Sequence, residues 1–362
     1  MTTDQLIPSL APDEFTPETV YLNTASMGLL PVRTRTALSA DLAAWAAGRC
    51  SPVGYDVPVA AARSAFARLV GTVPERVAIG SQVSALVALV AESLPSGAEV
   101  LLAEGEFTSL TQPFHGRADL AVRTVPLEQL AESVGPATAL VAVSVVQSAD
   151  GRVTDLPALR AATAAHGARL LADATQSAGW LPLRADDADF LVCSTYKWLL
   201  CPRGTAFLAV GPEAAATLRP IAPGWYAGED PWANCYDSVE LARSARRFDV
   251  APAWSAFVGT AASLSLIEEL TPERIGAHDL ALADRFRDGL AALGHTPTPG
   301  RSAVVSIAGL GPAATRLAQA DVVTSNRAGN LRVAFHLYNS SPDVDRVLDV
   351  LDVLAASASS QR

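Results

Sequence analysis

Lysine is nearly absent from this sequence of 362 residues. Lys197 is its only lysine, and the other 26 of the 27 basic residues are arginines. A guanidinium keeps its proton, whereas a lysine amine can lose one and attack a carbonyl carbon. Where arginine serves as the general cation, a single lysine is a candidate nucleophile. The alternative is that a single lysine occurs by chance in an arginine-rich chain. The sequence around Lys197 distinguishes these two interpretations.

Cysteine and histidine are sparse as well. The chain has four cysteines and five histidines, with no C-x-x-C pair and no H-E-x-x-H sequence. Zinc sites and disulfide frameworks depend on such spacings. The sequence therefore predicts neither.

Excess positive charge and long apolar runs are also missing. The net charge is −10 and the isoelectric point is near 5.0, which argues against nucleic acid or an anionic membrane surface as the main partner. Apolar runs such as residues 85–91 and 139–146 are far shorter than the roughly 20 residues that span a bilayer. The first residues lack the basic and apolar regions of a secretory signal, so we expect a cytoplasmic protein.

What the sequence does contain is typical of a folded protein with more than one domain. Half of the residues are hydrophobic and 18% are charged, which is a globular composition. A chain of this length suits two domains. We expect an arm over residues 1–20, a large domain over 21–250 and a small carboxyl-terminal domain over 251–362.

The large domain alternates apolar runs with helical spacing. Helices are expected within 34–70 and over 84–94 and 157–166, and strands are expected at 77–79, 99–102, 121–125, 140–146, 169–172, 190–193 and 205–210. Continuous apolar strands separated by amphipathic helices predict an α/β domain with a mainly parallel sheet covered on both faces. Ligands bind beyond the carboxyl ends of such strands. After residue 250, helical stretches and two further strands predict a smaller α+β domain.

Two of these predicted strands end in residues whose side chains could take part in catalysis. The apolar run 169–172 leads into Asp173, and the run 190–193 leads into S-T-Y-K, which contains Lys197. A carboxylate and the only lysine would meet at one sheet edge. A structural ion pair is an alternative, but it would not need the sole lysine. Pyridoxal 5′-phosphate needs this pair, because lysine forms its Schiff base and a carboxylate keeps its pyridine nitrogen protonated.

At these two motifs the sequence resembles a known family. D-A-T-Q-S-A-G and S-T-Y-K-W-L-L-C-P-R-G are similar to the class V aminotransferase-like group of fold type I pyridoxal phosphate enzymes, which includes cysteine desulfurases, isopenicillin N epimerase-like proteins and kynureninases. The resemblance implies a fold type I architecture, a pyridoxal phosphate cofactor, an amino acid substrate and a homodimer with its active site near the interface. It makes Lys197 the Schiff base and the acid/base at Cα, and it places Asp173 on the pyridine nitrogen.

The resemblance also assigns the remaining cofactor contacts. Gln176 would hydrogen-bond the ring hydroxyl, and Ser194 the phosphate. A segment between a strand and a helix would bind the phosphate as well, and helix starts offer free N–H donors; it holds Ser81, Gln82 and Val83. The alternative for the segment is an ordinary N-cap serine.

Four further residues come from the same resemblance. Phe107 would stack on the cofactor ring, with a buried core phenylalanine as the alternative. Ser148 replaces a family asparagine and counts among the cofactor-binding candidates. Arg332, in G-N-L-R-V-A-F-H, would grip the substrate α-carboxylate with a two-pronged hydrogen bond. Asn23 would approach the substrate.

Several departures from the family bear on the reaction. Residues 320–331 lack the cysteine that desulfurases carry ahead of the substrate arginine, and Tyr196 stands where many of them have histidine. The segment by which a second subunit reaches the phosphate has no clean match at 250–254. We therefore expect transamination or β-elimination, including C–S lysis. The alternatives are racemisation or epimerisation and, less favoured, a desulfurase or a non-catalytic pyridoxal phosphate-binding module.

Overall fold

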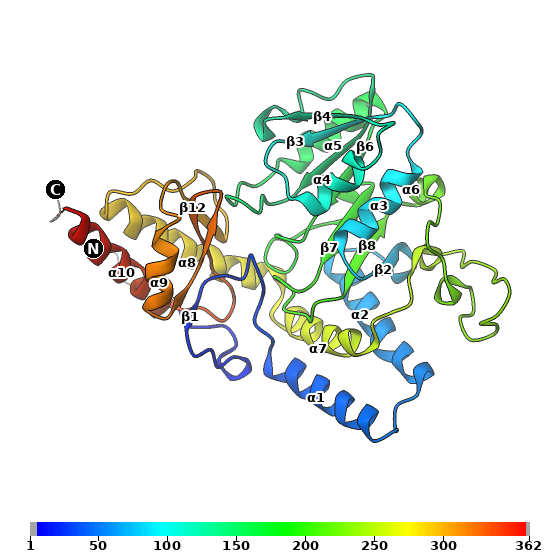
Figure 1. Ribbon diagram of the computed structural model, residues 1–362, viewed down its shortest axis with the longest axis horizontal. Helices are drawn as coiled ribbons and strands as arrows, with labels where there is room; N and C mark the ends of the chain where they lie inside the picture. Colours follow the sequence, from blue (N-terminus) through cyan, green and yellow to red (C-terminus); the bar gives the residue numbers. More distant parts are fainter. Residues whose placement is uncertain (1–5, 360–362) are drawn as a thin grey trace.

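A seven-stranded sheet organises the large domain in the computed structural model, which describes residues 6–359 (Figure 1). The strand order is β2-β8-β7-β6-β5-β3-β4. The strands are β2 (Val77–Gly80), β3 (Glu99–Ala103), β4 (Ala121–Val125), β5 (Thr138–Ser144), β6 (Arg169–Asp173), β7 (Phe190–Ser194) and β8 (Ala206–Val210). Only β8 runs antiparallel to its neighbours in this sheet. The prediction of a mainly parallel sheet is confirmed.

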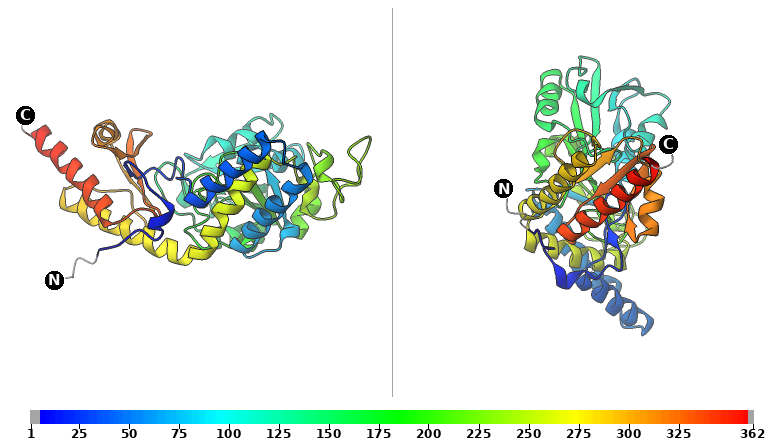
Figure 2. Two further views of the ribbon diagram at one scale, coloured as in Figure 1. Left: turned by 90° about the horizontal axis from the view of Figure 1, so that it is seen from below. Right: turned by 90° about the vertical axis from the view of Figure 1, so that its left-hand side faces the viewer.

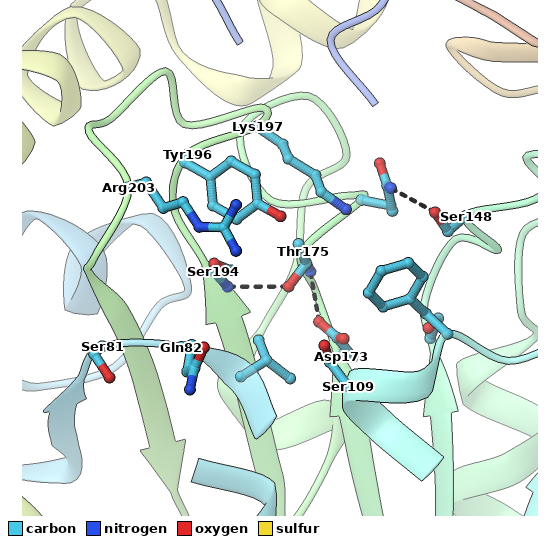
Figure 3. Close-up of a pocket in the computed structure, with 14 residues that line it drawn as sticks. Ser81, Gln82, Ser109, Ser148, Asp173, Thr175, Ser194, Tyr196, Lys197 and Arg203 are labelled. Atoms are coloured by element: carbon cyan, nitrogen blue, oxygen red, sulfur yellow. Dashed lines mark hydrogen bonds between the residues drawn. The ribbon is translucent and has the colours of Figure 1, made fainter. Parts of the chain in front are cut away.

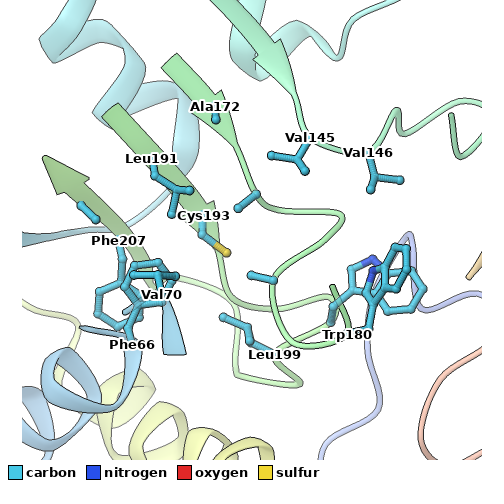
Figure 4. Packing of buried hydrophobic residues seen from close by; sticks show 14 of the residues in the cluster. Phe66, Val70, Val145, Val146, Ala172, Trp180, Leu191, Cys193, Leu199 and Phe207 are labelled. Atoms are coloured by element: carbon cyan, nitrogen blue, oxygen red, sulfur yellow. The ribbon is translucent and has the colours of Figure 1, made fainter. Parts of the chain in front are cut away.

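Helices cover both faces of this sheet, as predicted. Leu102 packs in one apolar cluster with helices α3 (Val83–Ser93) and α4 (Thr108–His115). Its neighbour Leu101 packs in the other, with α2 (Asp56–Leu69), α5 (Leu156–His166) and α7 (Trp254–Leu270). Figure 4 shows the second cluster beneath the strands. Because successive strand residues point to opposite faces, burial on both faces produces continuous apolar runs.

The amino-terminal helical region contains two helices rather than one. Helix α1 (Val32–Ala46) ends before α2 begins, and it packs against α7. The helical spacing of Leu42 and Trp45 correctly indicated a helix, but these side chains are 55% and 60% exposed. In Figure 2, α1 extends away from the rest of the large domain.

The second part of the chain forms a smaller α+β unit, as expected. Its antiparallel sheet has the order β11-β12-β9, and a short parallel pair joins β1 to β10. The elements are β1 (Val20–Tyr21), β9 (Val304–Ile307), β10 (Val322–Val323), β11 (Ser325–Arg327), β12 (Asn330–Ala334), α8 (Pro272–Ala292), α9 (Ala313–Gln319) and α10 (Ser341–Ser359). Helix α6 (Pro212–Thr217) belongs to the large domain.

The packing bears on where the two domains divide. Apolar residues of α7 belong to the cluster of the large domain, and so does Ile275 at the start of α8. A third cluster holds the later part of α8, from Leu282, with β9, β12 and α10. We propose that the division lies within α8 rather than at residue 250.

A buried ion pair holds the strand that leads to the predicted phosphate segment. Asp249 accepts hydrogen bonds from Arg63 at 2.6 Å and from the backbone N–H of Ile79 at 2.8 Å. Arg63 also donates to the carbonyl of Val77. Both charged side chains are buried, where an ion pair with further hydrogen bonds resists separation. The pair thus fixes β2 just before Ser81.

Candidate active site

The predicted site residues meet in one cavity at the carboxyl edge of the sheet. This cavity is lined by Ser81, Gln82, Val83, Phe107, Ser109, Ser144, Ser148, Asp173, Thr175, Gln176, Ser194, Tyr196, Lys197 and Arg203. Figure 3 shows Lys197 and Arg203 above the ends of the strands that carry Asp173 and Ser194. Of the predicted residues, Asn23 and Arg332 do not line the cavity.

Strand pairing brings the carboxylate and the amine together. Strands β6 and β7 run parallel, with Asp173 opposite Val192. Their carboxyl ends therefore meet at one edge. The hydroxyl of Thr175 accepts the N–H of Ser194 at 3.0 Å, and the Thr175 N–H donates to Asp173 Oδ1 at 2.8 Å. This bridge fixes the Asp173 carboxylate relative to the loop that carries Lys197.

Lys197 is buried, and its amine makes no ion pair with a carboxylate of residues 6–359. The residue is 5% exposed. Burial lowers the pKa of Lys197 from 10.5 to about 8; Asp173 opposes this shift, while Arg332 and Arg327 add to it. Its Nζ lies 5.2 Å from the centre of the Phe107 ring. The neutral amine therefore forms at a lower pH than in an exposed lysine.

Burial also perturbs Asp173. It raises the pKa of the Asp173 carboxyl, and the hydrogen bonds from Thr175 and the charge of Lys197 oppose that shift. A carboxylate enclosed in this way gains from a cationic partner, because an opposite charge nearby favours its ionised form. A protonated pyridine nitrogen would be such a partner.

Gln176 is already fully engaged through its amide. Its Nε2 donates to the carbonyl of Ala25 at 2.9 Å and to Ser148 Oγ at 3.0 Å, and its Oε1 accepts the indole N–H of Trp198 at 2.8 Å. The two amide hydrogens are therefore both used. A cofactor ring hydroxyl would therefore have to replace one of these hydrogen-bond partners of Gln176. Ser148 is the partner that also lines the cavity.

The start of helix α3 forms another wall. Val83 is its first residue, and the N-cap Gln82 makes no capping hydrogen bond through its side chain. The first N–H groups of a helix lack partners within the helix and favour an anion. Ser81, Ser194 and the guanidinium of Arg203 line the same cavity. These groups all face the one cavity, as the predicted phosphate site requires.

Phe107 is not a core residue. It is 47% exposed, so the alternative of a buried core phenylalanine is wrong. The preceding Glu106 anchors the segment, because its carboxylate accepts bonds from the Ser144 N–H and hydroxyl and from the amide of Gln147. Burial raises the pKa of Glu106. The anchor leaves the Phe107 ring facing the cavity.

Arg332 lies behind Ser148 and is 1% exposed. It donates to Ser325 Oγ, to the backbone carbonyl of Ser148 and to Ser26 Oγ. The Ser26 hydroxyl in turn donates to Asn23 Oδ1 at 2.7 Å. Burial lowers the pKa of Arg332 to about 9, and Arg327 adds to the shift. Asn23 and Arg332 are therefore linked through one serine.

Sequence reasoning did not assign several cavity residues. These are Ser109, Ser144, Thr175, Tyr196 and Arg203. Thr175 and Arg203 lay inside the two quoted motifs, so a signal was available for them. Ser109 and Ser144 carry no local signal, because their position depends on the tertiary fold.

The cysteines lie outside the cavity. Cys193 and Cys201 are buried, and burial raises the pKa of Cys201 to about 12 and that of Cys193 well above its usual range. Thiols in this state are poor nucleophiles. Within residues 6–359 no group of histidine, cysteine and acidic side chains could hold a metal ion, and no helix is long and apolar enough to cross a membrane.

Comparisons with known proteins point in one direction. A family model described as Aminotransferase class-V matches residues 62–311. The uncharacterized aminotransferase YcbU of Bacillus subtilis (strain 168) is 30% identical and covers 80% of this chain and 81% of its own. Isopenicillin N epimerase of Streptomyces clavuligerus is 29% identical, and the match covers 93% of this chain and 95% of the epimerase. A complex of the cystine C-S lyase C-DES with its product cysteine persulfide superposes with a TM-score of 0.85 at 22% identity, covering 92% and 97%. This likeness confirms the predicted fold type I architecture.

The low pKa of Lys197 is testable in cofactor-free protein. The rate at which trinitrobenzenesulfonate modifies the Lys197 peptide, followed by mass spectrometry, should rise with pH and reach half its maximum near pH 8. Only the neutral amine reacts, so the midpoint follows the pKa. Asp173→Asn removes the charge that favours the ammonium and should move the midpoint to lower pH.

The control is Asp186→Asn, at an exposed carboxylate paired with Arg76. It should leave the midpoint unchanged. A wild-type midpoint above pH 10, or a midpoint that Asp173→Asn does not move, would contradict this account of the site.

Proposed function

The chain belongs to the aminotransferase class-V family and is a pyridoxal 5′-phosphate enzyme, and from this premise we propose that it acts at Cα or Cβ of an α-amino acid. The observation that carries the proposal is the single cavity that holds Lys197, Asp173 and the start of helix α3. When bound, the cofactor supplies an aldehyde that condenses with amines and a ring that accepts electrons from Cα.

The residues present fit this cofactor. The unpartnered amine of Lys197 suits the aldehyde, and Asp173 suits the pyridine nitrogen. Ser81, Ser194 and Arg203, with the N–H groups at the start of α3, would hold the phosphate. The exposed ring of Phe107 offers an aromatic face to the cofactor ring.

Each of these residues has a role in the proposed reaction. Lys197, with a pKa of about 8, can take a proton from Cα and return it, as a general base tuned toward the working pH does. Asp173 would keep the ring nitrogen of the cofactor protonated. Arg332 would exchange its hydrogen bonds to Ser26 and Ser148 for the substrate α-carboxylate. Phe107 and Tyr196 flank the amine on its open side.

Within this chemistry we propose transamination or β-elimination, with epimerisation as the alternative. All three reactions begin with the same loss of a proton from Cα and differ in where the proton returns or which bond breaks next. The aminotransferase name of one relative supports the first, and the C-S lyase name of the structural neighbour supports the second. The epimerase name of another relative keeps the alternative open.

We also propose that the chain works as a homodimer, which the family resemblance implies. Helix α1 extends away from the rest of the large domain (Figure 2). Leu42 and Trp45 on this helix, and Val53 and Val57 after it, are all more than half exposed. A second copy of the chain would cover such a surface.

The proposed function predicts turnover that depends on Asp173. Holoenzyme incubated with a panel of amino acids and cysteine conjugates should form a keto acid, pyruvate or an inverted amino acid, identified by mass spectrometry and chiral chromatography. Asp173→Asn should lower the rate by about a hundredfold or more, or ~2.7 kcal/mol of transition-state stabilisation, because the ring nitrogen loses its charged partner. Cofactor binding should weaken less than the rate falls. Turnover near the wild-type rate in the variant would contradict the role given to Asp173.

The cysteines separate elimination from persulfide chemistry. Each of Cys50, Cys193, Cys201 and Cys235, changed singly to Ala, should leave an active enzyme, because none of them lines the cavity. C–S cleavage should release the sulfur fragment to solvent. Cys193→Ala should lower the melting temperature, since Cys193 packs in the core. A protein-bound persulfide found during turnover, or one variant that is folded and loaded but inactive, would restore the desulfurase alternative.

A further inference from the structure

Two arginines converge on one hydroxyl beside the active site. Ser26 Oγ accepts a hydrogen bond from Arg332 Nη2 at 2.7 Å and another from Arg327 Nη2 at 2.9 Å. Neither guanidinium makes an ion pair with a carboxylate of residues 6–359. Arg63, by contrast, pairs with Asp249 at 2.6 Å. Two adjacent like charges without a counter-charge favour an anionic ligand.

The two arginines lie at different depths. Arg332 is buried, and its other nitrogens are taken up by Ser325 and Ser148. Arg327 is exposed and lines an outer cavity that is also lined by Lys197, Phe107 and Tyr196. The guanidinium of Arg327 therefore borders the space in front of the reactive amine, on the open side of the inner cavity.

The backbone fixes this position of Arg327. Arg327 is the last residue of β11 and pairs with Asn330, the first residue of β12. The two residues between them, Ala328 and Gly329, have φ of 50° and 81°, as in the tight turns that favour hairpins. The side chain of Asn326 accepts the N–H of Gly329 at 3.1 Å. The same hairpin thus carries both Arg327 and Arg332.

The electrostatics around Lys197 agree with this geometry. Arg327 lowers the pKa of both Lys197 and Arg332, so its charge reaches the reactive amine and the deeper guanidinium. One carboxylate, Glu106, also lines the outer cavity. Its oxygens accept hydrogen bonds from Ser144 and Gln147, and it makes no ion pair with Arg327.

We propose that Arg327 binds a second carboxylate, at the end of the substrate side chain, while Arg332 binds the α-carboxylate. This inference rests on the proposed function and names its substrate class: α-amino acids with an anionic side chain. We assign the side-chain carboxylate to Arg327 because Arg327 is exposed and Arg332 is buried. Arg327 faces the outer cavity, into which the side chain of an amino acid held at Lys197 would extend. Ser26 sets the spacing between the two anion-binding groups.

The test compares substrates that differ only in this charge. Suitable pairs are glutamate with glutamine, aspartate with asparagine, and S-carboxymethylcysteine with S-carbamoylmethylcysteine. For a pair that the holoenzyme turns over, kcat/KM should favour the acid by about tenfold or more, as expected for a hydrogen bond between charged groups. Arg327→Gln should abolish this preference, so that the acid and its neutral partner react with similar kcat/KM in the variant. Arg316→Gln, at an exposed arginine outside the cavity, is the control and should preserve the preference.

A second measurement does not depend on the cofactor or on turnover. Titration calorimetry of cofactor-free protein should show tighter binding of glutarate than of butyrate, and Arg327→Gln should remove the difference. Equal weakening of both ligands in the variant would mean that both arginines grip one carboxylate, which overturns the proposal. Turnover without any preference for acids would overturn it too. Absence of any turnover in wild-type holoenzyme would instead refute the proposed function, while the glutarate titration still decides the role of Arg327.

Discussion

The parallel pairing of β6 with β7 is the constraint on which the site depends. It aligns Asp173 with Val192, so the loop after β7 carries Lys197 past the carboxylate. A shift of register by one residue would point Asp173 to the other face of the sheet. The hydrogen bonds of Thr175 to Asp173 and Ser194 then join the two strand ends.

Burial of Lys197 and Asp173 changes the protonation of both side chains. Lys197 is enclosed with cationic arginines nearby, and the charge of Asp173 only partly compensates. The amine is therefore easier to deprotonate than an exposed lysine, as a nucleophile and proton carrier requires. The same burial makes an unpartnered Asp173 costly. Lys197 thus suits a molecule with an aldehyde near its amine, and Asp173 suits a basic ring nitrogen on the same molecule. In the proposed function, the start of α3 would supply the third contact, for a phosphate.

Much of this arrangement could be predicted from the sequence, for identifiable physical reasons. Strands buried on both faces leave continuous apolar runs, so β2 to β8 were located to within a few residues, although the run predicted at 140–146 forms β5 at Thr138–Ser144. The lone lysine and the motif around Asp173 indicated the cofactor. The exposure of Leu42 and Trp45 could not be predicted, because periodicity does not show which face of a helix finds a partner. The placement of Arg327 depends on a hairpin turn and on contact with Ser26, and one arginine among 26 carries no local signal.

The central claim is that the single lysine of this chain carries the cofactor, and one labelling experiment tests it most directly. Purified protein loaded with pyridoxal 5′-phosphate is reduced with borohydride, digested and mapped by mass spectrometry. The account predicts loss of the yellow colour and a pyridoxyl group on the peptide that contains Lys197. A protein that does not take up the cofactor, or a label confined to the amino-terminal amine, would contradict it.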